Sequence, residues 1–289
     1  MELSLYHETT FEYEGPVRDN INEVRLRPLT DALQTTLDFR LTTVPRSDPR
    51  SYTDCFGNIV HTFDISEPHS RLVITAASRV ITTPPAVPAG LDLPDRYIPL
   101  RLEDSGDLID FLQPTARADF ARNIVELARE AREAGPADRL APVVTRLCGM
   151  LHGRMEYVPG ATDVGTIAGA ALAAARGVCQ DYTHIMLAAL RVLGIPARYT
   201  SGYFHPEGAE GEVGEQASHA WVESWFASAG WVGVDPTNDR LVDEHYIRVA
   251  YGRDYGDVAP IRGSYRGAET RGMEVEVSVS AGWQQQQQQ

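Results

Sequence analysis

The sequence is poor in cysteine, in long apolar runs and in positive charge, and each shortage excludes a class of protein. Its three cysteines, Cys55, Cys148 and Cys179, are too few to build a disulfide framework, so we expect a reducing, cytoplasmic setting in which a thiol can stay free. No stretch approaches the roughly 20 apolar residues of a membrane-spanning helix. Residues 1–7 have neither the basic nor the apolar segment of a signal peptide. We therefore predict no membrane partner.

Acidic residues outnumber basic ones by 40 to 26, and the formal net charge is -14. A chain this negative repels a polyanion, and no basic stripe offsets the repulsion, so we predict no nucleic-acid partner. It contains no zinc-knuckle spacing and no EF-hand-like loop, and we predict no metal and no cofactor. With 289 residues, 43% of them hydrophobic, the chain can bury the core of one large domain or two ordinary ones.

The N-terminal third reads as β-structure. Apolar and polar residues alternate over 37–42 and 72–80, which is typical of half-buried strands, and residues 56–58 form a hairpin-turn signal. We predict a β-sandwich-like N-terminal domain over residues 1–95. Four prolines within residues 83–95 mark a linker at its end.

Helices and then strands follow the linker, so the predicted fold class is α+β. Helical periodicity covers residues 120–135, 140–151, 166–175 and 179–193, and strand patterns cover 197–204, 218–226, 231–235 and 273–280. We assign residues 96–283 to a second domain, a core whose motifs fall within 157–240. Six glutamines at 284–289 form a low-complexity tail that we expect to be disordered.

The segment that carries chemistry is a glycine-containing turn, residues 176–178, that leads into a helix beginning at Cys179. Unpaired N–H groups and the positive end of the helix dipole favour an anion at this position, so we expect a partly ionised thiol. The same N–H groups can stabilise an oxyanion beside the sulfur. His219 opens one predicted strand and Asp235 ends the next. Two neighbouring antiparallel strands can bring them together as proton donor and orienting carboxylate.

Several motifs together resemble the bacterial transglutaminase-like family. They are Gly-Val-Cys-Gln-Asp at 177–181, Gly-Ile-Pro-Ala-Arg-Tyr at 194–199, Ser-His-Ala-Trp-Val-Glu at 218–223 and Asp-Pro-Thr-Asn at 235–238. Tyr-His-Glu-Thr at 6–9, Arg-Leu-Arg-Pro at 25–28 and Asp-Cys-Phe-Gly-Asn at 54–58 resemble the companion β domain of that family. The resemblance implies a papain-like core with a Cys179–His219–Asp235 triad, and a peptide or protein amide as substrate. It also implies a thioester acyl-enzyme, resolved by water (peptidase or amidase) or by an amine (acyl transfer).

Three further residues are weaker candidates. The Gln180 amide follows the nucleophile and can line the site, and Tyr157 can supply a second oxyanion donor. Trp221 lies on the same strand face as His219. It can form part of the pocket wall or of the hydrophobic core, and we favour the core. The acidic segment 207–215 is expected to be a solvated loop, with a lid that selects amine-bearing substrates as the sharper alternative.

Two other classes of function stay open. The chain can be a non-catalytic binding or scaffold module on a transglutaminase-like fold, although an intact triad argues against a degenerate enzyme. The three triad side chains can also form an open zinc site. The sequence leaves the natural substrate and the oligomeric state undetermined.

Overall fold

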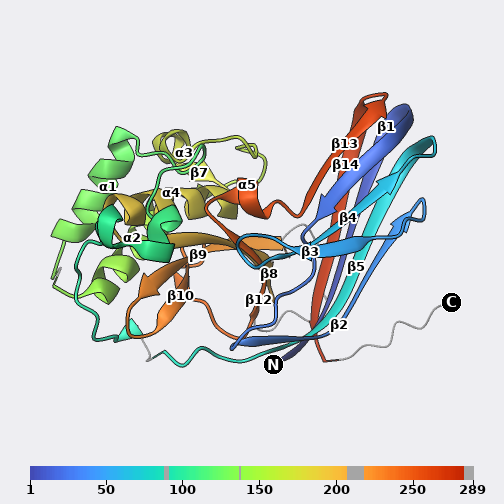
Figure 1. Ribbon diagram of the computed structural model, residues 1–289. Coiled ribbons are helices and arrows are strands. Elements are labelled where there is room, and N and C mark those ends of the chain that lie inside the picture. Colours follow the sequence, from blue (N-terminus) through green and yellow to red (C-terminus); the bar gives the residue numbers. More distant parts are fainter. Residues whose placement is uncertain (88–90, 137, 207–217, 283–289) are drawn as a thin grey trace.

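A computed structural model describes residues 1–87, 91–136, 138–206 and 218–282. Figure 1 shows a helical body wrapped on one curled sheet, beside a second sheet of long strands. The predicted α+β class is confirmed. The predicted acidic loop at 207–215 and the glutamine tail at 284–289 lie outside the described residues. None of the described helices has both the length and the apolar character needed to cross a membrane.

Strand β1 (Glu2–Val24) is the centre of the N-terminal sheet. Its first half pairs with β5 (His69–Thr82) and β14 (Thr270–Ala281), and its second half pairs with β4 (Ile59–Ile65) and β13 (Ile261–Gly267). Strands β2 (Gln34–Val44) and β3 (Arg50–Thr53) lie outside β5 and β4. The predicted turn at 56–58 connects β3 to β4. Side chains from β1, β4 and β5 share one apolar cluster, so the two halves of the sheet fold over a common core.

The structure differs from the predicted domain boundary at the C-terminus. The predicted second domain, residues 96–283, includes β13 and β14, yet these strands extend the N-terminal sheet, with Leu3 opposite Ala281 and Tyr13 opposite Thr270. The alternation at 273–280 correctly indicates a strand. A period-two pattern predicts a strand but does not predict which strand will pair with it, so it could not place this strand in the N-terminal sheet.

The core sheet has five antiparallel strands in the order β11 (Arg240–Leu241), β10 (Gly230–Asp235), β9 (Ser218–Phe226), β8 (Ala197–Phe204) and β12 (Tyr246–Gly252). Helix α4 (Cys179–Val192) packs on β8 and β9, and nearly all of its residues are buried. It ends before Gly194, whose φ of +70° suits glycine.

The smaller elements complete the helical layer around α4. These are η2 (Leu102–Asp104), η3 (Gly106–Phe111), α1 (Arg122–Glu133), α2 (Leu140–Arg154), β6 (Glu156–Tyr157), α3 (Ala168–Ala174), β7 (Arg176–Gly177) and α5 (Tyr255–Val258). Helices α1 to α3 confirm the helical periodicity found in the sequence.

Strand β12 is an edge of the core sheet, and the N-terminal sheet satisfies its outward backbone groups. The Asn58 amide donates to the carbonyl of Tyr251 and accepts from its N–H, both at 2.7 Å. The Gln34 amide makes the same pair of bonds with Arg248, at 2.9 and 2.8 Å. Two carboxamides therefore take the place of a missing neighbour strand, which protects the edge.

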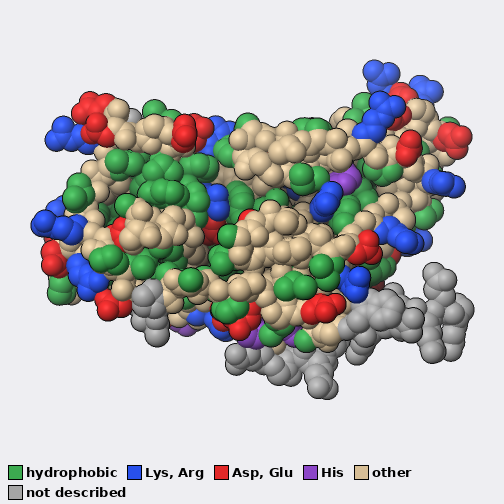
Figure 2. Space-filling model, turned by 60° about the horizontal axis from the view of Figure 1, so that its bottom comes forward, with side chains coloured by type: hydrophobic (Ala, Val, Ile, Leu, Met, Phe, Trp, Pro, Cys, Tyr) green, Lys and Arg blue, Asp and Glu red, His purple; other side chains and the backbone are tan. Residues whose placement is uncertain are grey.

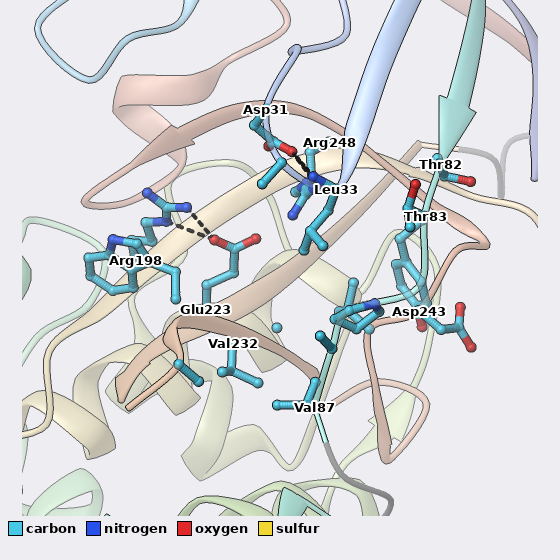
Figure 3. A pocket seen from close by; sticks show the side chains of 18 of the residues that line it. Asp31, Leu33, Thr82, Thr83, Val87, Arg198, Glu223, Val232, Asp243 and Arg248 are labelled. Carbon is cyan, nitrogen blue, oxygen red and sulfur yellow. Dashed lines mark hydrogen bonds and ion pairs between the residues drawn. The ribbon is translucent and has the colours of Figure 1, made fainter. Parts of the chain in front are cut away.

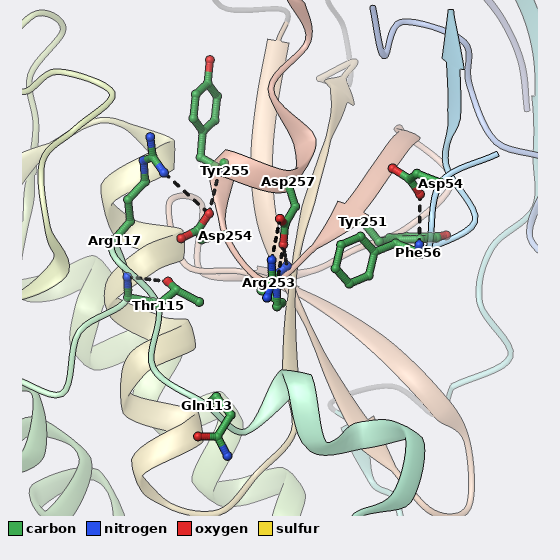
Figure 4. Close-up of polar contacts among 12 residues, drawn as sticks. Asp54, Phe56, Gln113, Thr115, Arg117, Tyr251, Arg253, Asp254, Tyr255 and Asp257 are labelled. Atoms are coloured by element: carbon green, nitrogen blue, oxygen red, sulfur yellow. Dashed lines mark hydrogen bonds and ion pairs between the residues drawn. The ribbon is translucent and has the colours of Figure 1, made fainter. Parts of the chain in front are cut away.

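Apolar and ionic contacts reinforce this docking. Leu3 and Leu5 of β1 pack with Tyr203 and Ile247 of the core sheet in one buried cluster. Arg253, which pairs with Asp257 at 2.8 Å, lies over the ring of Phe56 in the β3–β4 turn (Figure 4). The two sheets therefore present one joint surface. On the face seen in Figure 2, acidic and arginine side chains interleave without a continuous patch of one sign.

Candidate active site

Cys179 is the first residue of α4 and is partly exposed. The preceding turn is fixed by a short parallel bridge in which Tyr157 lies opposite Gly177. Asp181 then closes the turn, because its Oδ2 accepts the Val178 N–H at 2.8 Å and the Thr162 hydroxyl at 2.6 Å. Asp181 is therefore a cap that holds the cysteine at the start of the helix.

Gly177 is required by this cap. A Cβ at position 177 would lie 2.5 Å from Asp181 Oδ2 and 2.7 Å from its Cβ. We expect Gly177→Ala to lower the free energy of unfolding by about 1–3 kcal/mol, because the cap must shift to make room. Urea unfolding measures the change. Gly153→Ala is the matched control, since its Cβ would meet nothing within 4 Å on the exposed face of α2. Equal stability of the two variants would refute the packing argument.

His219 and Asp235 lie in contact, as the two neighbouring strands β9 and β10 predict. His219 Nε2 is 2.7 Å from Asp235 Oδ2, and Asp235 is fully buried. The same oxygen accepts from the Asn238 amide at 2.7 Å and from the Tyr246 hydroxyl at 2.8 Å. The other oxygen accepts the Thr237 N–H at 2.9 Å. This network fixes the carboxylate and leaves Nδ1 of His219 for another partner.

The electrostatics favour an ion pair between the two side chains. Burial opposes ionisation of Asp235, but hydrogen bonds from His219, Asn238 and Tyr246 outweigh it and lower its pKa. Burial likewise opposes the imidazolium, but the hydrogen bond and charge of Asp235 dominate and raise the pKa of His219 to about 10. The neighbouring Cys179 side chain adds to this increase. Cys179 and His219 also line one cavity.

A cavity of about 500 Å³ opens beside Cys179 and His219. Gln180 lines it, as expected, together with Tyr199 of β8. Strands β1, β13 and β14 of the N-terminal sheet form its opposite wall. The cavity therefore lies between the two sheets, and the N-terminal sheet is part of the site.

The other two weaker candidates do not line this cavity. Trp221 is fully buried, and its ring meets the Tyr246 ring edge-on at 5.1 Å, so it supports the residue that holds Asp235. Tyr157 is 45% exposed on β6. Burial and then the neighbouring Cys179 raise the pKa of Tyr157 to about 12, so its hydroxyl keeps its proton.

Three residues of the site were not singled out by the sequence. Asn238 was part of the quoted Asp-Pro-Thr-Asn motif and was given no role. Tyr199 lies on the face of β8 that packs on α4, the same face as Ala197 two residues earlier, so the alternation of side chains along the strand could have indicated its place. Tyr246 comes from β12, which lies beside β8 in the sheet, and no local pattern links it to Asp235.

A second cavity, of about 620 Å³, lies on the face of the core sheet turned away from α4 (Figure 3). Its charged groups already have partners. Arg198 donates to Glu223 at 2.8 Å and lies over the rings of Tyr251 and Trp231. Arg248 pairs with Asp31 at 2.8 Å. The pair of Arg248 and Asp31 joins the core sheet to the N-terminal segment.

Among the described residues, the acidic and histidine side chains close enough to share a metal ion are Asp243, Glu244 and His245. Arg240 already pairs with Asp243 there. The triad is not one of these groups, so the geometry offers no support for the open zinc site considered above.

Comparisons with known proteins identify the family. Residues 3–81 match the bacterial transglutaminase-like N-terminal region, and residues 125–236 match the transglutaminase-like superfamily. An uncharacterized protein of Mycobacterium leprae is 34% identical over 96% of this chain and 98% of its own length. One of Mycobacterium tuberculosis is also 34% identical, over 94% and 90%.

Two further likenesses concern the fold and the core. A solved structure from Cytophaga hutchinsonii, described as that of a candidate cysteine protease, has a TM-score of 0.73 at 22% identity over 99% of this chain and 92% of that one. A protein-glutamine gamma-glutamyltransferase of Pseudomonas aeruginosa is 36% identical over 38% of this chain and 17% of its own length. The chain belongs to the transglutaminase-like superfamily and carries the bacterial transglutaminase-like N-terminal region.

Proposed function

We propose that the protein is an amide-directed acyl enzyme in which Cys179 is the nucleophile, His219 the general acid and base, and Asp235 the orienting carboxylate. The observation that carries the proposal is the buried pair of His219 and Asp235 in a cavity that Cys179 also lines. Asp235 bonds one nitrogen of His219 at 2.7 Å, and Cys179 and His219 both line the cavity. The raised pKa of His219 supports a cationic imidazole beside the sulfur of Cys179.

The proposed cycle has two halves. The Cys179 thiolate attacks the amide carbonyl, and the oxyanion is stabilised by the free N–H groups at the start of α4. The C–N bond then breaks, the leaving nitrogen takes the imidazolium proton, and a thioester remains. In the second half, neutral His219 removes a proton from water or an amine as it attacks the thioester. The C–S bond breaks and the thiolate and imidazolium are restored.

Both outcomes of the second half are consistent with the superfamily. Water gives a peptidase or amidase, and an amine gives a transferase, as the name of the Pseudomonas aeruginosa relative describes for that protein. We propose a peptide or protein amide as the acyl donor. The proposed cytoplasmic location still rests on the sparse cysteines.

Trapping the acyl-enzyme tests the proposal. The protein is mixed with a panel of amide and peptide donors, quenched in acid and analysed by mass spectrometry, with and without an added primary amine. We expect a thioester adduct on Cys179 that disappears when the amine or water resolves it. All 26 basic residues of this chain are arginine, so no lysine side chain of its own competes as acceptor. Incorporation of the added amine is therefore measured without competition from lysine side chains.

The scaffold alternative predicts a different result. Donors would bind without any adduct on Cys179, and Cys179→Ala would bind them as the wild-type protein does. Adducts spread equally over Cys55 and Cys179 would also contradict the proposal, because Cys55 is an exposed thiol away from the triad.

A further inference from the structure

Apart from the reacting centre, the described residues that line the cavity beside Cys179 are uncharged. The chain as a whole is 23% charged, yet no Asp, Glu, Lys or Arg is among the described residues that line this cavity. His7 is the histidine on its N-terminal wall, and burial lowers the pKa of His7 to about 4, so it is neutral at pH 7. His219 then supplies the local charge, and it belongs to the reacting centre. The second cavity, in contrast, is lined by arginines and carboxylates.

The wall opposite Cys179 is polar although it is uncharged. A bulge in β1 between Arg18 and Ile21, with Asp19 at a φ of +51°, shifts the register, so Tyr13 before it, Asn20 within it and Asn22 after it all line the cavity. The Asn20 amide donates to the Tyr13 hydroxyl at 2.9 Å, and the Asn22 amide donates to Asn20 Oδ1 at 2.9 Å. Asn20 also contacts His69 Nε2 at 3.2 Å. The neighbouring side chains therefore hold these groups in fixed orientations.

This network leaves one acceptor and one donor unused. Within the described part of the chain no group donates to Asn22 Oδ1, and no acceptor takes the Tyr13 O–H. Gly263 leaves room for the Asn22 oxygen, since a Cβ there would lie 2.3 Å from it. A neutral donor and a neutral acceptor on one wall match an amide group, which offers N–H and C=O together.

We infer that β1 recognises an uncharged amide group of the acyl donor, remote from the bond that is broken, and that the cavity rejects charged groups at the same position. This inference rests on the proposed function. The physical basis is desolvation: a carboxylate or ammonium that enters the cavity loses water and finds no opposite charge on the wall. A carboxamide or peptide group loses water too, but it regains hydrogen bonds from Tyr13 and Asn22. The N-terminal sheet is then a specificity element for the core.

Thiol-directed probes test the inference without a known substrate. Three dipeptide acrylamides are compared that differ only in a distal glutamine, glutamate or lysine side chain. The rate of Cys179 modification is measured by mass spectrometry, relative to the rate with glutathione. We expect the glutamine probe to react at least about tenfold faster than either charged probe, since a site that hydrogen-bonds a neutral group discriminates against analogues that leave it unpaired. The acidic-segment hypothesis for 207–215 predicts the opposite, with the lysine probe fastest.

Asn22→Asp should change the order of the probes. The new carboxylate is expected to favour the lysine probe and to slow the glutamate probe further. Thr42→Asp is the matched control. Thr42 lies opposite Thr75 on β5, and the Thr75 hydroxyl donates to Glu8 on the face of the sheet turned away from the cavity. The Thr42→Asp variant therefore adds the same charge to the other face of the same sheet. It should leave the wild-type order unchanged.

The outcomes separate this inference from the proposed function. Equal rates for the three probes in the wild-type protein, with Cys179 still modified faster than Cys55, overturn the inference and leave the proposed function standing. No preference for Cys179 with any probe overturns both. The wild-type comparison needs no variant, so it holds even if Asn22→Asp fails to fold.

Discussion

Cys179→Ala is expected to lower turnover by at least about 10⁴-fold while the protein stays folded. The loss is large because a nucleophile knockout removes the covalent route, and the residues that act with it cannot compensate. The fold should persist because Cys179 is partly exposed and the cap at Asp181 does not use its sulfur. We expect a change in the free energy of unfolding of about 1 kcal/mol or less. Steady-state kinetics on the best donor and urea unfolding provide the two measurements.

The other two cysteines supply the controls. Cys55→Ala removes an exposed thiol and should leave turnover unchanged. Cys148 is buried beneath the triad, its thiol bonds the Asp235 carbonyl, and burial raises the pKa of the Cys148 thiol, so it should resist iodoacetamide near neutral pH. Alkylation should therefore select Cys179. Full turnover by Cys179→Ala would reject the nucleophile assignment.

Asp235→Asn is expected to reduce turnover on the order of 10²-fold and to move the basic limb of the pH profile. The carboxylate stabilises the imidazolium, so its removal lowers the pKa of His219 from about 10 toward the ordinary value of 6.5. The wild-type enzyme should keep its activity as pH rises until it approaches about 10, where His219 loses its proton. The variant should lose activity at a lower pH. Rates of Cys179 alkylation across pH provide an independent readout.

Asp239→Asn is the matched control for this change. Asp239 lies four residues further along the same turn, is exposed, and makes the same change in net charge. Its φ of +49° is well tolerated by asparagine, so the backbone should not suffer. An unchanged basic limb in Asp235→Asn, or an equal shift in Asp239→Asn, would show that Asp235 does not set the charge of His219.

The parts of the fold that follow from local pattern were predictable. Helix α4 begins at Cys179 as expected because a glycine turn and an amphipathic run mark its start, and strands β8 and β9 have the predicted bounds. The contact between His219 and Asp235 followed because β9 and β10 are consecutive antiparallel strands. In each case the sequence neighbours are also neighbours in space.

What could not be predicted depends on long-range pairing. Tyr246 reaches Asp235 only because β12 closes the far side of the sheet next to β8. The cavity wall of Asn20 and Asn22 requires the docking of one sheet on the other, through amides such as Asn58 that look like ordinary turn residues. A single sequence gives no measure of such contacts, because their strength lies in the fit between two distant segments.

The pairing of β1 with β14 also determines the order in which the protein can complete itself. Leu3 meets Ala281, so one side of the first strand has no partner until residues 270–281 have been synthesised. The core of helices α1 to α4 and strands β8 to β12 is translated in between. During that interval the unpaired side of β1 is an open template for strands of other chains. Completion of the N-terminal sheet is therefore a late folding step that depends on contacts between residues far apart in the sequence. A chain that lacks β13 and β14 would keep the unpaired side of β1 exposed and would stay prone to aggregation.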